Sequence, residues 1–264
     1  MSLRTYTGPA PAIRVAPSGV AFGWFMALAA IALQICYPLV DKPDRATLSL
    51  YAVLVFFAAV VVHATTYHRL RGFLMVGLVV PAIGWLAERI GSTTGYPFGD
   101  YSYTDQLAPF VLGVPLAVPL AWSMMGYPAY VAASTIVARR RWLVPLIAGW
   151  ALMAWDLFLD PMMTDLNAWN WNRVTPDLLG VTGIPLTNYA GWLAVGVLVG
   201  AVLLVLPARR ASPAQPAALF LWVYASSVLA AATFFDRPEV ALVGGIAMGL
   251  VAFPLTWFLW VDRQ

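Results

Sequence analysis

The stretch YAGWLAVGVLVGAVLLVLP, residues 189–207, contains no charged side chain. A helix rises 1.5 Å per residue, so this run extends about 28 Å, close to the ~30 Å thickness of a bilayer's hydrocarbon core. A helix on the surface of a soluble protein would need a polar face, which this stretch lacks. The stretch therefore predicts a transmembrane helix.

The whole chain has the same character. Of its 264 residues, 61% are apolar and 10% are charged, with a net charge of +3, whereas soluble domains have about 25% charged residues. This composition indicates an all-α, polytopic membrane helix bundle. The first 17 residues are polar and rich in proline, so we expect no cleavable signal peptide. The single cysteine, Cys36, lies in an apolar run, so we expect neither a disulfide nor a thiolate metal site.

Eight apolar segments are long enough to cross a membrane, and we expect one multi-pass domain over residues 1–264 in the cell membrane. The predicted spans lie near 19–40, 47–66, 72–90, 112–137, 142–163, 189–207, 216–235 and 239–261. The fourth span contains Pro115, Pro119 and Pro128, which predict a kinked helix or a late helix start.

Basic residues predict the orientation, because cytoplasmic loops carry an excess of Arg and Lys. Ten of the 15 basic residues fall on the side that holds both termini, which we therefore expect to be cytoplasmic. These ten are Arg4, Arg14, Arg69, Arg71, Arg139, Arg140, Arg141, Arg209, Arg210 and Arg263. Among the acids, only Asp262 falls on that side, so the opposite face of the bundle is predicted to be acidic.

The two longest connections, about 91–111 and 164–188, both lie on this acidic face and are rich in Trp, Tyr, Phe and Asn. Loops of this length are usually functional or disordered, and the aromatic content argues against disorder. Each loop runs into a Gly-x-Pro-Leu sequence with a tryptophan nine residues after the glycine, Trp122 and Trp192. This similarity predicts a parallel internal repeat, related by an axis along the membrane normal.

Glu88 is predicted just inside the acidic interface, near the end of the third span. It shares a helix face with Pro81, Gly84 and Gly91, and small residues on a face allow another helix or a ligand to approach closely. A structural alternative is a carboxylate at the interface that pairs with the neighbouring Arg89.

Asp156 and Asp160 lie one turn apart on one face of the fifth span, in the run WDLFLDPMM. Two like charges at this spacing repel, so one of them is expected to keep its proton near neutral pH, as a general acid requires. Ionisable residues within a span are costly and mark functional sites. The structural alternative is that Asp160 caps the helix end and Asp156 bonds a neighbouring helix.

The remaining aromatic and polar residues are expected to have less specific roles. The loop aromatics can form an interfacial belt or line a pocket. His63 and His68 are expected at the interface, because no metal-binding motif accompanies them. Residues 139–141, three arginines, are a topology signal and a contact for lipid headgroups.

Three membrane classes fit the sequence poorly. A retinal protein needs a lysine within a span, and the single lysine, Lys42, lies outside the spans. A membrane prenyltransferase would hold Mg²⁺ and diphosphate with two Asp-rich motifs. Asp156 and Asp160 resemble one of these motifs, and the second motif is absent. A transporter would have polar groups in the middle of its spans, whereas here they gather at one end.

The chain resembles the membrane-protein family of carotenoid biosynthesis, which includes hydratases of acyclic carotenoid ends. The resemblance rests on the run ERIGSTTGYPFGDYSY from Glu88, on WDLFLDPM from Trp155, and on the sequences GVPL and GIPLTN. It covers about residues 80–192. It implies an all-helical membrane fold, an acyclic polyene substrate, water as co-substrate, and other carotenoid enzymes and membrane lipids as partners. No cofactor, metal or nucleic acid is expected.

The implied reaction protonates a trisubstituted alkene, and water captures the tertiary carbocation. We expect the pair Asp156 and Asp160 to donate the proton and Glu88 to activate the water, or the reverse. The residues expected to orient the water or to bind the substrate end are Phe98, Asp100, Tyr101, Tyr103, Trp122, Trp155, Trp169, Trp171, Asn188 and Trp192. The rival hypothesis is a non-catalytic protein that binds carotenoid or lipid, or an accessory subunit.

Overall fold

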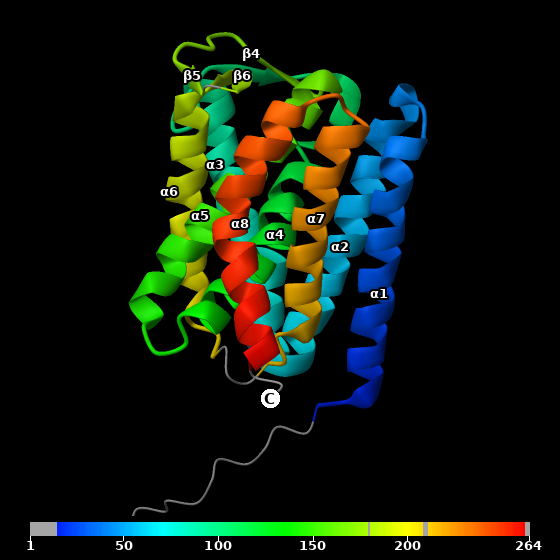
Figure 1. Cartoon of the computed structure of the whole chain (residues 1–264), viewed down its shortest axis with the longest axis vertical. Coiled ribbons are helices and arrows are strands. Elements are labelled where there is room, and N and C mark those ends of the chain that lie inside the picture. Colours follow the sequence, from blue (N-terminus) through cyan, green and yellow to red (C-terminus); the bar gives the residue numbers. More distant parts are fainter. Residues whose placement is uncertain (1–14, 179, 208–210, 262–264) are drawn as a thin grey trace, which may run out of the picture.

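The computed structural model describes residues 15–178, 180–207 and 211–261, and its helices run side by side as one bundle (Figure 1). The helices are α1 (Pro17–Cys36), α2 (Lys42–Gly72), α3 (Val80–Thr94), α4 (Ala117–Ile136), α5 (Val144–Asp165), α6 (Leu186–Leu203), α7 (Ala214–Thr233) and α8 (Pro238–Val261), with the shorter η1 (Tyr37–Leu39), η2 (Phe73–Val79), η3 (Asp105–Leu107) and η4 (Arg141–Leu143). Each predicted span overlaps one of the long helices. The prediction of an all-α membrane bundle is confirmed at this level.

Six helical segments of the described residues are long and apolar enough to cross a membrane. They are Pro17–Leu39, Lys42–Thr94, Arg141–Asp165, Leu186–Leu203, Ala214–Thr233 and Pro238–Val261. The number of eight spans and the cytoplasmic side of the termini therefore stay predictions. Several residues used for the orientation lie outside the described residues, namely Arg4, Arg14, Arg209, Arg210, Asp262 and Arg263.

The 53-residue segment Lys42–Thr94 folds back on itself near Arg69, whose φ of 56° departs from helical geometry. Close packing at Gly72 makes the reversal possible, since a Cβ there would lie 2.1 Å from the Ala64 carbonyl oxygen. The returning chain continues as the π-helix η2, where Gly77 faces Val61 of α2. A hairpin of two helices thus forms with its reversal at the basic residues Arg69 and Arg71.

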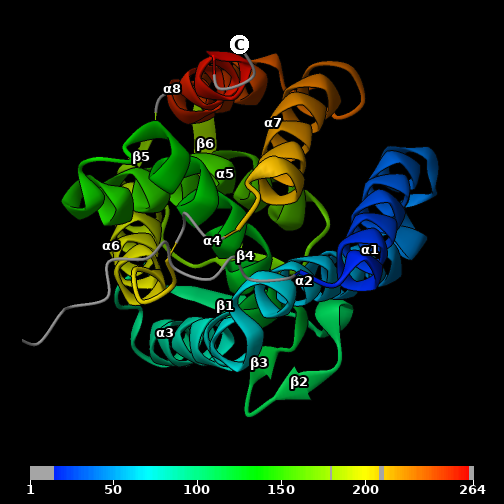
Figure 2. The same cartoon turned by 90° about the horizontal axis from the view of Figure 1, so that it is seen from below.

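Helix α4 lies at the centre of the bundle, surrounded by the other helices (Figure 2). Its residues from Ala121 to Ala133 are all buried. Because α4 faces protein on every side, it can contain Trp, Tyr and Ser, which lower its hydropathy, and it is not among the six candidate spans. The late start predicted from its prolines is confirmed, because the helix begins at Ala117, after Pro115.

Polar contacts fix the neighbours of α4. Ser123 donates a hydrogen bond to the Val76 carbonyl of η2. The i→i+5 pattern leaves this carbonyl without a backbone donor, because residue i+5 is Pro81. His63 of α2 bonds the Tyr127 hydroxyl at 3.0 Å and the Ser212 carbonyl at 3.0 Å. His63 is buried within the bundle, where it joins α2 to α4, and its expected place at the membrane interface stays a prediction.

The two long loops meet at the end of the bundle that is uppermost in Figure 1. They contain the short strands β1 (Tyr101–Tyr103), β2 (Phe110–Val111), β3 (Val114–Pro115), β4 (Trp169–Trp171), β5 (Asp177–Leu178) and β6 (Val181–Pro185). Strand β1 of the first loop pairs antiparallel with β4 of the second. The loops therefore form one joint cover.

The two loops also share their local architecture. Each ends in a two-stranded hairpin, β2–β3 or β5–β6. The two repeat glycines adopt similar left-handed conformations, with φ of 84° at Gly113 and 88° at Gly183. Leu116 and Leu186 then each donate their backbone N–H to a proline carbonyl at 2.8 Å. These equivalences support the internal repeat predicted from the sequence.

Candidate active site

Glu88 lies in the penultimate turn of α3, and its side chain is only 5% exposed. Its carboxylate accepts three hydrogen bonds, from the Tyr101 hydroxyl at 2.7 Å, the Tyr103 hydroxyl at 2.6 Å and the Trp122 indole N–H at 2.9 Å. The tyrosines come from β1 and the tryptophan from α4. Glu88 thus joins its helix to the loop cover and to the central helix, and among the described residues it forms no ion pair.

Two glycines on the same face of α3 make this arrangement possible. A Cβ at Gly84 would lie 2.7 Å from the Trp122 ring, and one at Gly91 would lie 2.7 Å from the Phe98 ring. The close approach expected from small residues beside Glu88 is therefore present, and the approaching groups are the aromatic side chains of the site.

Asp156 and Asp160 lie on one face of α5, with exposed fractions of 0% and 2%. One amide group, from Asn188 at the start of α6, donates to both carboxyl groups, at 2.6 Å to Asp156 Oδ2 and also to Asp160 Oδ2. The indole N–H of Trp169 donates to Asp160 Oδ1 at 3.0 Å. The pair therefore occupies one small polar region enclosed by aromatic and apolar side chains.

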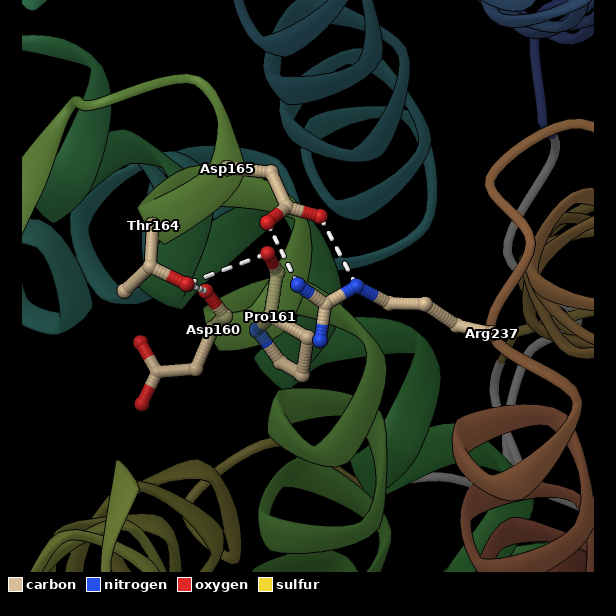
Figure 3. Close-up of polar contacts among 5 residues, drawn as sticks. All are labelled: Asp160, Pro161, Thr164, Asp165 and Arg237. Atoms are coloured by element: carbon tan, nitrogen blue, oxygen red, sulfur yellow. Dashed lines mark hydrogen bonds and ion pairs between the residues drawn. The ribbon is translucent and has the colours of Figure 1, made fainter. Parts of the chain in front are cut away.

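Arg237 does not pair with the three acids. It directly precedes α8 and forms an ion pair with Asp165 at the end of α5. Figure 3 shows the Asp160 carboxylate pointing away from Arg237, while Thr164 donates its hydroxyl to the Asp160 and Pro161 carbonyls. The described part of the chain thus contains three buried carboxyl groups in this region without a cation paired to any of them.

Aromatic rings connect the two halves of the site. Trp122 and Trp192, the tryptophans of the repeat, stack with ring centroids 4.0 Å apart, and Trp155 meets Trp192 edge-on at 5.8 Å. In the paired strands of the cover, the rings of Tyr101 and Trp171 lie opposite each other at 5.1 Å. The cover therefore presents a continuous aromatic lining to the acids.

Two of the acids, Glu88 and Asp160, and several of these rings line a cavity of about 70 Å³. Nine of the predicted site residues line it, namely Glu88, Phe98, Tyr101, Tyr103, Asp160, Trp169, Trp171, Asn188 and Trp192. Such a volume suits a small end group or one to two water molecules.

The remaining predicted residues lie elsewhere. Asp156 and Trp122 lie behind the cavity wall and bond residues that line it. Trp155 faces a second, wider cavity next to the first. Asp100 is exposed and accepts a hydrogen bond from the Asn172 amide at 2.9 Å, so the structure does not bring it to the cavity. Its contacts fasten one loop to the other.

The two tyrosines bonded to Glu88 remain donors over a wide pH range. Burial raises the pKa of the Tyr101 phenol, and the neighbouring Glu88 charge raises it further. The same two causes raise the pKa of Tyr103. Both hydroxyls are therefore protonated throughout the physiological range.

Three buried polar atoms near the acids lack a hydrogen-bond partner in the described residues, and one of them belongs to Tyr189, which the predicted site did not include. The three atoms are the Tyr189 hydroxyl, Asp156 Oδ1 and the Trp171 indole nitrogen. Buried polar groups normally have partners, so these atoms are available to a ligand. Tyr189 follows Asn188 directly, but nothing in its sequence context separates it from an interfacial tyrosine.

The described residues contain no group of three or more His, Cys, Asp or Glu side chains arranged to hold a metal ion. The site therefore consists of carboxyl groups, their hydrogen-bond donors and aromatic rings. Such a set can transfer protons and stabilise a cation at short range.

Comparison with known proteins agrees with this chemistry. A family model described as carotenoid biosynthesis protein matches residues 48–252. A bisanhydrobacterioruberin hydratase from Haloarcula japonica is 33% identical over 132 residues, which cover 48% of this chain and 43% of that protein. The match thus spans less than half of the relative's length. No solved structure matches the chain.

Proposed function

Because this chain belongs to the carotenoid biosynthesis protein family, we propose that it is a multi-pass hydratase of the cell membrane that adds water to the terminal isopropylidene double bond of an acyclic carotenoid. The observation that carries this proposal is the set of buried carboxyl groups around an aromatic cavity, with no cation paired to them in the described residues. The hydratase activity of the Haloarcula relative points to the same reaction class.

The burial of the three acids supports a stored proton. Three negative charges in a region of low dielectric, without a cation, would cost many kcal/mol. Asp156 and Asp160 share one amide donor, so a proton held by this pair removes the repulsion between them. Asp160 lines the cavity and Asp156 does not, so Asp160 is the proposed donor and Asp156 its partner.

Glu88 is the proposed base. An ionised carboxylate is only an acceptor of hydrogen bonds, and Glu88 has three donors around it. The donors hold the carboxylate in one orientation at the cavity wall. A water molecule in the cavity can reach it while the substrate end lies against the rings.

The atoms of the reaction balance without another reactant. The proton of Asp160 adds to the less substituted alkene carbon, the π bond breaks, and a tertiary carbocation forms. Trp169, Trp171 and Phe98 surround this cation with ring faces, which stabilises it. The oxygen of water bonds the cation, Glu88 takes the released proton, and this proton returns to Asp160 before the next turnover.

The test is expression in cells that make lycopene or a longer acyclic carotenoid, followed by mass spectrometry of the pigments. We expect a product heavier by one water, and in D₂O one additional deuterium that does not exchange. Asp160→Asn and Glu88→Gln should each lower product formation by about 10²–10⁴-fold, the usual contribution of a general acid or base. Asp165→Asn is the matched control, because Asp165 is 46% exposed and pairs with Arg237 outside the cavity.

Two outcomes would remove the proposal. Unchanged pigment mass in every substrate background would favour the rival hypothesis, a non-catalytic carotenoid-binding protein or accessory subunit. Near-normal product formation by both Asp160→Asn and Asp156→Asn would remove the proposed proton donor. Comparable amounts of each variant in the membrane fraction exclude misfolding as the cause of a loss.

A further inference from the structure

A second cavity, of about 400 Å³, lies between the α1–α2 hairpin and α7, with residues of α4 and α5 on its inner wall. Ligand pockets usually have volumes of about 300–1,000 Å³, so this cavity is large enough for an extended ligand, unlike the cavity beside the acids. Its lining is mainly apolar and aromatic, including Trp155, Phe158 and Trp222. Neither the sequence pattern nor the proposed chemistry accounts for it.

The wide cavity lies directly beside the acid cavity. Five residues line both, Ser49, Val53, Ala121, Leu159 and Met163. They come from α2, α4 and α5. A molecule whose end lies beside Asp160 would therefore extend past these five residues into the wide cavity.

The outer edge of the wide cavity is apolar and exposed. On the α1 side, Ile35 is 49% and Leu39 68% exposed. On the α7 side, Leu229 is 58% and Phe234 51% exposed. All four line the cavity, so it opens sideways, onto the surface that faces lipid in a membrane bundle.

Two contacts frame this opening. The Trp222 indole of α7 donates to the Gln34 side chain of α1 at 2.7 Å. Nearer the loops, the rings of Tyr37 and Phe235 meet edge-on at 6.1 Å. The Arg45 guanidinium covers both rings, at 5.7 Å from Tyr37 and 5.6 Å from Phe235. This cluster closes the opening toward the acidic face, so the way out leads into the bilayer.

We propose that the opening between α1 and α7 is the lateral entrance for the substrate, and that the wide cavity holds the polyene chain while its end group reaches the acids. This inference rests on the proposed function for the identity of the occupant. A long, rigid apolar chain fits the adjacency of the two cavities and the apolar edges of the opening. It also follows that one end of the molecule enters at a time, while the rest remains in the lipid.

The test narrows the wide cavity without touching the acids. Ala230 lines it from α7, and Ala52 lines it from α2. Ala230→Phe and Ala52→Phe should lower conversion of the full-length carotenoid at least roughly tenfold, since misplacing a reacting group by 1 Å can cost 10²-fold. A short acyclic isoprenoid with the same end group should be converted at the wild-type rate, because it does not extend into the wide cavity. Ala232→Phe is the matched control, since Ala232 lies on α7 but is exposed and outside the cavity.

A binding measurement separates this inference from the proposed function. In the Asp160→Asn background, polyene that copurifies with the protein, measured by its absorbance, should fall when Ala230→Phe is added and not when Ala232→Phe is added. Loss of binding on narrowing supports the lateral entrance even if the wild-type protein hydrates nothing. Full binding and full conversion in both narrowed variants would overturn it, and so would equal losses with long and short substrates.

Discussion

Gly84 offers a sharp test of the packing that holds Glu88. In Gly84→Ala the new methyl group would lie 2.7 Å from Cδ1, 2.8 Å from Cγ and 2.9 Å from Cβ of Trp122. Ordinary contacts begin near 3.4 Å, so the indole must move by about 0.7 Å. It cannot move freely, because it is fully buried and stacks on Trp192 at 4.0 Å.

The size of the effect follows from this geometry. Forced overpacking of a dense core costs about 1–3 kcal/mol. The same movement lengthens the 2.9 Å bond from Trp122 to Glu88 beyond hydrogen-bonding distance. A hydrogen bond to a charged group contributes about 1.5–3 kcal/mol, so we expect a roughly ten- to hundred-fold loss of conversion.

The assay measures two quantities, the hydrated fraction of carotenoid in producing cells and the thermal midpoint of the protein in detergent. Gly245→Ala is the matched control, because a Cβ at Gly245 of α8 would meet only Val228, at an ordinary 3.4 Å. The control should be as stable as the wild type or slightly more so, since alanine favours a helix over glycine by about 1 kcal/mol. Wild-type stability and conversion in Gly84→Ala would refute the close packing of α3 on Trp122, and a destabilised but fully active variant would refute the role of its bond to Glu88.

Three further predictions concern pH, surface charge and the helix reversal. The pKa values of Tyr101 and Tyr103 are raised in the folded protein, so these tyrosines ionise first in the unfolded chain, near pH 10. Their contribution to stability is therefore complete below that pH and is lost above it. The thermal midpoint should decline less between pH 9 and 11 in the double variant Tyr101→Phe/Tyr103→Phe than in the wild type, whereas the exposed Tyr96→Phe should decline as the wild type does. Arg237→Gln breaks a partly exposed ion pair and should change the unfolding free energy by less than about 1 kcal/mol, with normal conversion; a large loss of conversion would give this pair a role in the site. Gly72→Ala brings a methyl group to 2.1 Å from the Ala64 carbonyl oxygen of α2, so folded protein should no longer accumulate in the membrane fraction. Normal accumulation of this variant would contradict the tight reversal.

The sequence allowed much of the fold to be predicted, because uncharged runs of about 20 residues have few alternatives to a membrane helix. It did not reveal that α4 is central, since its Trp, Tyr and Ser side chains make it look less like a span than the outer helices do. The reversal near Arg69 was predicted, because the basic residues Arg69 and Arg71 separate the apolar runs 47–66 and 72–90. Tertiary packing, rather than local pattern, decides the central place of α4.

For the candidate site, the acids and most aromatic residues could be named from the sequence, because carboxyl groups inside spans are costly and rare. Their partners could not be assigned in the same way. Asn188 was expected to orient water, whereas in the structure it donates to two carboxyl groups at once. The wide cavity draws its residues from α1, α2, α4, α5 and α7, so no local sequence pattern signals it as a binding surface.

The equivalence of the two loops has a consequence for how such a centre can arise. Glu88 lies six residues before the end of α3, and Asp160 lies five residues before the end of α5, at corresponding corners of the repeat. The two halves also meet through the stacked rings of Trp122 and Trp192, one tryptophan from each half. A duplication of one half would provide two matching niches, and divergence that placed the proposed acceptor in one and the proposed donor in the other would then account for the division of labour without a new architecture.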